Sequence, residues 1–184
     1  MEAESLQKRM QVYLLRHGIA EEGRIGKSDA DRELTPEGRR KLRDTIRAAA
    51  LADVHPTLIL TSPLTRATQT AQIAADILHY KHETLRTKAL LPGSHVEQVW
   101  DEIRIHRDEA ELLLVGHDPL FTQLSGYLLG TPELRIDFKK GAILRVDFDG
   151  FGARPRGILR WFLTSKLTHT SGMRPRNLSA PTKS

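Results

Sequence analysis

The sequence predicts an α/β fold, a three-layer α/β/α sandwich with a mostly parallel central sheet. Short apolar runs at 11–16, 57–61 and 111–116 are typical of strands that are covered on both faces. Longer segments between them carry apolar residues at helical spacing. Because strand and helix patterns alternate along the chain, we expect helices on both faces of one sheet.

Each predicted helix has a single apolar stripe that can pack on a sheet. The predicted helices cover residues 36–50, 63–78, 96–107 and 119–129. Two later apolar runs, 142–148 and 158–163, are separated by the Gly/Pro-rich stretch DGFGARPRG. This pattern predicts a hairpin at the far side of the sheet.

Two strand-to-helix turns share one construction. Ser62-Pro63 follows the second apolar run, and Asp118-Pro119 closely follows the third. In each turn a capping residue precedes a proline, which predicts helices that begin at the prolines. Ligands of open α/β sheets bind at the carboxyl ends of the strands, and helix N-termini favour anions.

Composition narrows the class of protein. A chain of 184 residues with 39% apolar content predicts one domain, which we place at 1–168. The basic, Ser/Thr/Pro-rich segment 169–184 is expected to be a mobile tail. The sequence has no cysteine, no membrane-spanning run and no signal peptide, which predicts a cytoplasmic protein without disulfides. The net charge of +5 is spread along the chain, which disfavours a nucleic-acid partner.

Four candidate functional residues lie at the predicted carboxyl edge. Arg16 and His17 end the first strand, Arg66 lies early in the next helix, and His117 follows the third strand. Arginine forks match phosphate oxygens, and a neutral histidine is a nucleophile that can accept a phosphoryl group. The arginines disfavour an imidazolium at His17, and Gly18 would let substrate approach the backbone. The edge therefore predicts a nucleophile with its phosphate clamp.

Three sequence blocks carry a family resemblance. LLRHG, TSPLTRATQTA and LLLVGHDP resemble the motifs of the histidine phosphatase superfamily, over about residues 11–163. The RELTPEG segment and the small size most resemble the SixA-type phosphohistidine phosphatases, with a phosphoglycerate mutase-like fold. The resemblance implies that His17 is phosphorylated, that Arg16, Arg66 and His117 bind phosphate with Gly18, and that no metal or cofactor is needed.

One departure concerns the proton donor. Many superfamily members place a glutamate in the segment that corresponds to 88–97, which here reads KALLPGSHVE. Glu97 starts a predicted helix too late in this segment, whereas Glu21 and Glu22 are candidates just after the RHG block. Both are equally compatible with solvated loop positions, so the general acid is Glu21, Glu22 or none.

The leading hypothesis is a metal-independent phosphohydrolase that acts on phosphohistidine in a protein. A phosphatase of small phosphomonoesters or sugar phosphates is the first alternative, and a noncatalytic phosphate-binding module is the second. No histidine or carboxylate cluster has the spacing of a metal site, since His79 and His82 lack a nearby carboxylate pair. The expected partner is a phosphorylated protein or small molecule, and the sequence leaves the oligomeric state open.

Overall fold

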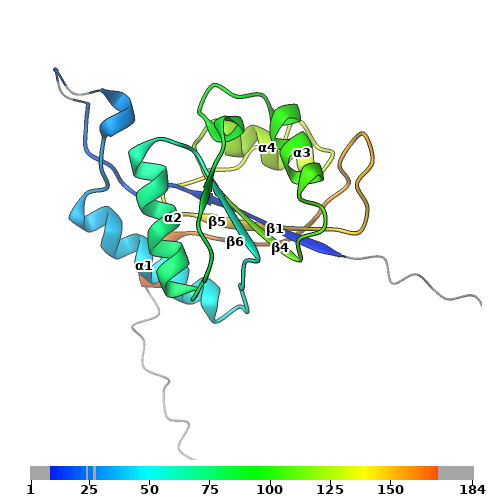
Figure 1. Ribbon diagram of the computed structural model, residues 1–184, viewed down its shortest axis with the longest axis horizontal. Helices are drawn as coiled ribbons and strands as arrows, with labels where there is room; N and C mark the ends of the chain where they lie inside the picture. The colour runs from blue at the N-terminus through cyan, green and yellow to red at the C-terminus, as the bar shows by residue number, and fades with distance from the viewer. Residues whose placement is uncertain (1–8, 24, 27, 170–184) are drawn as a thin grey trace, which may run out of the picture.

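A six-stranded mixed sheet forms the centre of the molecule (Figure 1). The computed structural model describes residues 9–23, 25–26 and 28–169. The sheet has the order β3-β2-β4-β1-β5-β6. The strands are β1 (Met10–Arg16), β2 (Leu58–Thr61), β3 (Leu85–Arg86), β4 (Glu111–Gly116), β5 (Ile143–Phe148) and β6 (Ile158–Leu163). Neighbours from β3 to β1 are parallel and β5 is antiparallel to β1 and β6, so the predicted mostly parallel sheet is confirmed.

Two pairs of helices cover the two faces of the sheet (Figure 1). On one face lie α1 (Pro36–Ala50) and α2 (Thr65–Ile77), and on the other α3 (Val96–Ile105) and α4 (Leu120–Leu128). A short fifth helix, α5 (Ser165–His169), packs beside α1. The predicted three-layer α/β/α sandwich is therefore confirmed.

The central strand β1 shows why the apolar run was informative. Val12 and Leu14 belong to the core cluster under α3 and α4, whereas Tyr13 and Leu15 belong to the cluster under α1 and α2. All four side chains are fully buried. Side chains alternate between the two faces of a strand, and here both faces are covered, so these four consecutive positions all carry large, mainly apolar side chains.

The predicted starts of two helices were wrong. Helix α2 begins at Thr65 rather than at Pro63, because Leu64 is still extended (φ −69°, ψ 138°). Helix α4 begins at Leu120, with Pro119 in the N-cap position that we assigned to Asp118. Ser62 is not the N-cap of α2, because it lies two residues before the N-cap Leu64, and its hydroxyl lies 2.8 Å from a histidine nitrogen of the site described below.

Short elements escaped the sequence analysis. The edge strand β3, the 3-10 helices η1 (Asp29–Asp31) and η2 (Lys88–Leu90), and helix α5 are too short for a periodic pattern. Helix α5 runs one residue past the domain limit at 168, and residues 170–184 of the expected tail lie outside the described residues. Within the described ranges, no helix is long and apolar enough to cross a membrane.

Candidate phosphoryl-transfer site

The carboxyl ends of three neighbouring strands define the site. Strand β4 pairs in parallel with β1 on one side and with β2 on the other. The pairing continues one step past the strands, because the His17 amide donates to the Gly116 carbonyl (3.0 Å) and the Ser62 amide donates to the Val115 carbonyl (2.9 Å). His17, Ser62 and His117 therefore leave the sheet side by side.

The structure brings the four predicted residues together. The ring centroids of His17 and His117 are 5.0 Å apart, with 58° between the ring planes. Both rings and the Arg66 side chain are buried, with 5%, 2% and 5% of their surface exposed. Arg16 is half-buried, and its charge acts on both imidazoles, as does that of Arg66.

One hydrogen bond sets the orientation of the His17 ring. Its Nδ1 lies 2.7 Å from the carbonyl oxygen of Gly18. Because a carbonyl only accepts hydrogen bonds, Nδ1 must carry the proton of the neutral ring. The lone pair is then on Nε2, which is the nitrogen available for attack.

Burial keeps His17 neutral. Desolvation is the main cause that lowers its pKa to about 3, and the neighbouring His117, Arg66 and Arg16 lower it further. The hydrogen bond to Gly18 acts in the opposite direction but is outweighed. The expected effect of the arginines is present, yet removal of the ring from water is the larger cause.

His117 is held by a serine from the neighbouring strand. Its Nε2 lies 2.8 Å from Ser62 Oγ, and burial, followed by the charges of Arg66, Arg16 and Arg32, lowers its pKa to about 3. Ser62 Oγ already accepts a long hydrogen bond from the Leu64 amide (3.4 Å). The Ser62 hydroxyl can therefore donate a hydrogen bond to His117 Nε2. The neutral His117 ring then carries its own hydrogen on Nδ1.

The two arginines are anchored by their outer nitrogens. Arg16 Nη1 donates to the Phe138 carbonyl and lies 4.0 Å from Asp118 Oδ2. Arg66 Nη1 and Nη2 donate to the carbonyl oxygen and to Oδ2 of Asp29, at 2.8 and 3.0 Å. Among the described residues, four buried side-chain nitrogens have no hydrogen-bond partner, namely Arg16 Nε, Arg32 Nε, Arg66 Nε and His117 Nδ1. Unpaired buried donors are costly, so their grouping indicates a site for an anion.

Asp29 and Arg32 are site residues that the sequence analysis missed. Asp29 bridges two cations, since its Oδ2 binds Arg66 and its Oδ1 lies 3.2 Å from Arg32 Nε, without hydrogen-bond alignment at the latter. Asp29 is 66% exposed, and η1 holds it over the start of α2. The acidic DAD segment was the only signal, and nothing in its spacing connects it with Arg66.

The glycine of the RHG block has a different role from the one expected. A side chain at Gly18 would meet the Gly38 carbonyl and the Leu34 side chain, both at 3.3 Å, rather than open space for a substrate. The Gly18 amide donates to Thr70 Oγ1 (3.2 Å). Gly18 therefore contributes its backbone to the site, and its missing side chain makes room for Leu34 and for the first turn of α1.

The three candidate acids are Glu21, Glu22 and Glu97, on two segments of the chain. Glu21 and Glu22 line a cavity of about 480 Å³ together with Leu34 and Pro36, and the Glu21 amide donates to the Glu33 carbonyl (2.8 Å). Glu97 lies in the first turn of α3, as predicted, with its side chain exposed.

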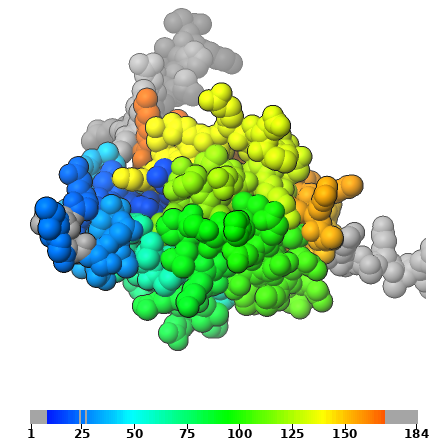
Figure 2. All heavy atoms as spheres, turned by 90° about the horizontal axis from the view of Figure 1, so that it is seen from above, coloured from blue at the N-terminus to red at the C-terminus, as the bar shows by residue number. Residues whose placement is uncertain are grey.

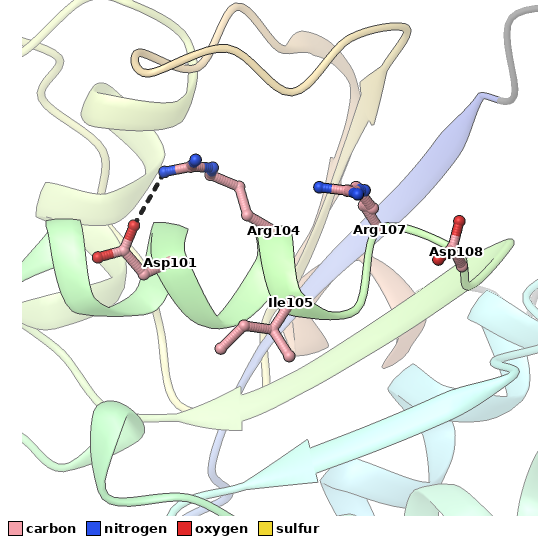
Figure 3. A pocket seen from close by; sticks show the side chains of 5 residues that line it. All are labelled: Asp101, Arg104, Ile105, Arg107 and Asp108. Carbon is pink, nitrogen blue, oxygen red and sulfur yellow. Dashed lines mark hydrogen bonds and ion pairs between the residues drawn. The ribbon is translucent and has the colours of Figure 1, made fainter.

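A second pocket, of about 420 Å³, lies at the far end of α3 (Figure 3). Its charged side chains follow in the order Asp101, Arg104, Arg107 and Asp108, and Arg104 pairs with Asp101 at 3.2 Å. This end of α3 leads into the amino end of β4, so the pocket lies opposite the four candidate residues. In the part of the chain that the structure describes, no group of three or more histidine or carboxylate side chains could hold a metal ion.

Comparisons with known proteins agree with this geometry. A family model of the histidine phosphatase superfamily (branch 1) matches residues 12–88. A protein of Picosynechococcus sp. strain PCC 7002 is 32% identical over 138 residues, which are 73% of this chain and 83% of that protein. The chain belongs to the histidine phosphatase superfamily. This histidine phosphatase is thus an enzyme that hydrolyses phosphorylated compounds.

Solved structures show the same fold. The protein histidine phosphatase SixA, complexed with tungstate, is 27% identical to this histidine phosphatase, with a TM-score of 0.75 over 86% of this chain and 99% of that chain. A SixA-type protein from Agrobacterium tumefaciens is 24% identical, with a TM-score of 0.70 and coverage of 84% and 98%. The alpha-ribazole phosphatase from Shigella flexneri is 18% identical, with a TM-score of 0.66 and coverage of 85% and 97%. The phosphoglycerate mutase-like fold is therefore confirmed.

Proposed function

We propose that this histidine phosphatase hydrolyses phosphohistidine in a protein, through a covalent intermediate on its own His17. The observation that carries the proposal is the buried, neutral His17 ring, whose Nδ1 is tied to the Gly18 carbonyl so that Nε2 is free to attack. His117 lies beside this ring, the charges of Arg16 and Arg66 act on it, and all three residues have a buried nitrogen without a hydrogen-bond partner. An activated nucleophile beside donors for a tetrahedral anion is what phosphoryl transfer requires.

The reaction takes place in two displacements. The lone pair of His17 Nε2 forms a bond to phosphorus, while the bond from phosphorus to the leaving nitrogen breaks and its electron pair stays on the leaving imidazole. Water then attacks the phosphohistidine, the electron pair returns to Nε2, and phosphate leaves. Between the two steps His17 carries positive charge, which the Gly18 carbonyl stabilises through Nδ1–H. Arg16, Arg66 and His117 donate to the phosphoryl oxygens.

The substrate preference follows from the leaving group. An alkoxide is a strong base, about as basic as hydroxide, and its departure normally needs a positioned proton donor. A phosphohistidine protonated at its distal nitrogen releases neutral imidazole, whose conjugate acid has a pKa of about 6.5. The carboxylate nearest to Arg66, on Asp29, already faces two guanidiniums with its two oxygens. A substrate that needs no enzymic acid therefore fits this site best.

The covalent intermediate provides the first test. Incubation with substrate labelled on phosphorus should give a protein-bound label that is stable in base and labile in acid. His17→Ala should lose the label and the turnover while it stays folded, because His17 lies just after the end of β1. His79→Ala is the matched control, since His79 lies outside the site. A labelled His17→Ala protein would contradict the proposed nucleophile.

The leaving group is tested by comparing substrates under one set of conditions. A phosphohistidine peptide should exceed glucose 6-phosphate in kcat/KM by at least tenfold, and turnover should persist in excess EDTA because two guanidiniums supply the positive charge. If glucose 6-phosphate is preferred tenfold, and Glu21→Gln or Glu22→Gln abolishes that preference, the protein is a phosphatase of small phosphomonoesters or sugar phosphates instead. Phosphate binding without turnover of any substrate would support the noncatalytic reading.

A further inference from the structure

A large basic cavity borders the catalytic arginine. It has a volume of about 880 Å³, and its lining includes five basic side chains and one carboxylate. We call it the basic pocket; its charged residues are Arg16, Lys41, Lys139, Lys140, Lys166 and Asp137. In Figure 2 the blue, yellow and orange segments that contribute to this lining meet on one side of the molecule. Because Arg16 belongs to both sites, the basic pocket opens directly beside the phosphoryl-transfer site.

Backbone contacts fix this arrangement. The Gly141 amide, which follows Lys140, donates to the carbonyl oxygens of Arg16 and His17, both at 3.1 Å. The Arg16 amide donates to the Ala142 carbonyl (3.0 Å), and its guanidinium donates to the Phe138 carbonyl. The turn that carries the two consecutive lysines is therefore attached to the backbone of the nucleophile itself.

The positive charge of the basic pocket is only partly neutralised. Lys139 pairs with Asp137 at 2.6 Å, and Lys41 pairs with Glu37 at 2.7 Å. Within the described residues, no ion pair is recorded for Lys140 or Lys166. Exposed like charges gathered in a concave surface create a potential that attracts anions and raises their local concentration.

We propose that the basic pocket binds acidic side chains of the protein whose phosphohistidine is hydrolysed, which rests on the proposed function. Apart from Arg16, its cations are lysines from three separate segments: α1, the turn before β5, and α5. Flexible, separated ammonium groups suit several carboxylates spread over a surface, whereas a single phosphate is best held by converging guanidinium forks. The chain's own residues 170–184 contain three basic and no acidic residues, so they do not supply the anion.

Two matched peptides test the inference. Both contain one phosphohistidine, introduced with phosphoramidate, flanked on each side by glycine and then by three glutamates in one peptide or three glutamines in the other. The wild-type enzyme should hydrolyse the acidic peptide with a kcat/KM about threefold to tenfold higher, because exposed ion pairs contribute modestly but also accelerate association. This preference should shrink in 0.5 M NaCl, where screening is stronger.

The variants separate the basic pocket from the chemistry. In Lys139→Ala/Lys140→Ala the two peptides should become nearly equal, and Lys166→Glu should reverse part of the preference. Turnover of p-nitrophenyl phosphate should change by less than twofold in each, since these exposed side chains do not touch His17. Lys81→Ala is the matched control and should keep the wild-type preference, because Lys81 precedes β3 and lies at the opposite edge of the sheet.

Three other outcomes would contradict the docking role, the phosphohistidine substrate or the protein partner. Equal rates on both peptides in the wild type, or an unchanged preference in the double variant, would refute the docking role while leaving the proposed function intact. Hydrolysis of p-nitrophenyl phosphate but of neither peptide would refute the phosphohistidine substrate itself. The wild type could instead have a higher kcat/KM for fructose 1,6-bisphosphate than for fructose 6-phosphate. If the double variant lost this difference, the basic pocket would bind a small polyanion rather than a protein.

Discussion

His17 and His117 share a confined space with two guanidiniums, and both imidazoles are neutral because they are cut off from water. Neutrality matters differently for each residue. For His17 it leaves a lone pair on Nε2, and for His117 it leaves one ring hydrogen whose position depends on Ser62. Burial therefore keeps both rings neutral, and one hydrogen bond to each ring determines which of its nitrogens carries the hydrogen.

Arg66→Ala should lower kcat/KM at least a hundredfold. Loss of a fixed charge from a phosphoryl-transfer site typically costs about 2.7–4 kcal/mol of transition-state stabilisation. The fold should survive, because Asp29, the partner that loses its guanidinium, is mostly exposed. Steady-state kinetics of Arg66→Ala beside Arg43→Ala, an exposed arginine of α1, would measure this. A loss below threefold would mean that Arg66 only positions η1.

Ser62→Ala should lower kcat about tenfold with a smaller effect on KM. The variant removes the partner that directs the hydrogen of His117 towards Nδ1, and a buried hydrogen bond of this kind contributes about 1 kcal/mol or more. Ser62→Thr, which keeps the hydroxyl, should retain more activity. If Ser62→Ala changes only the thermal stability and leaves the pH profile and kcat unaltered, the serine is structural.

The segment between β1 and α1 acts as a support for the site. Ala20 and Leu34 form an isolated antiparallel bridge, the Thr35 amide donates to the Ile19 carbonyl (2.9 Å), and Thr35 Oγ1 accepts from the Gly38 amide (3.0 Å). The predicted start of this helix at residue 36 was correct, because Pro36 is the first residue of α1, and Thr35 is its N-cap. The close contact of this segment and of α1 with the backbone after the RHG block became visible only in the tertiary structure.

Gly38→Ala should destabilise the protein by several kcal/mol and also reduce activity. An added Cβ would lie 2.1 Å from the Ile19 carbonyl oxygen, so the backbone next to Gly18 would have to move. Gly93→Ala is the matched control, because nothing lies within 4 Å of its Cβ position. Urea unfolding of both variants gives the comparison, and equal midpoints would contradict the close contact.

The stability of the whole molecule should depend on the two buried histidines in acid. Their pKa is about 3 in the folded protein and about 6.5 when unfolded, so the unfolded chain binds more protons between these values. The free energy of unfolding should therefore fall as the pH decreases from 6.5 towards 3, with a slope of up to about 1.4 kcal/mol per pH unit for each histidine.

Urea unfolding at pH 7.5, 6, 5 and 4 would measure this slope. His117→Gln should make it shallower, because one proton fewer is taken up on unfolding, whereas His82→Gln replaces an exposed histidine and should leave it unchanged. A slope that His117→Gln does not alter would show that other groups, such as Asp147 between Arg145 and Arg160, dominate acid denaturation.

Part of this protein was predictable because the information is local. The apolar runs predicted β1, β4 and the β5–β6 hairpin, and the motif residues at their ends predicted Arg16, His17, Arg66 and His117 as neighbours. Parallel strands present their carboxyl ends at one edge, so strand identity was enough to place those side chains together. The start of α1 at Pro36 was also predictable, since helix starts depend on adjacent residues such as the N-cap Thr35.

Contacts between segments far apart in the sequence were decided only by the tertiary structure. No local sequence pattern connects Asp29 with Arg66, Ser62 with His117, or Gly18 with Gly38. The helices after Ser62 and Asp118 begin later than predicted, at Thr65 and Leu120. The basic pocket likewise joins lysines of α1, the turn before β5 and α5. The sequence by itself determined the elements and the chemistry at their ends, whereas packing determined which charges meet, because that depends on distances no local pattern encodes.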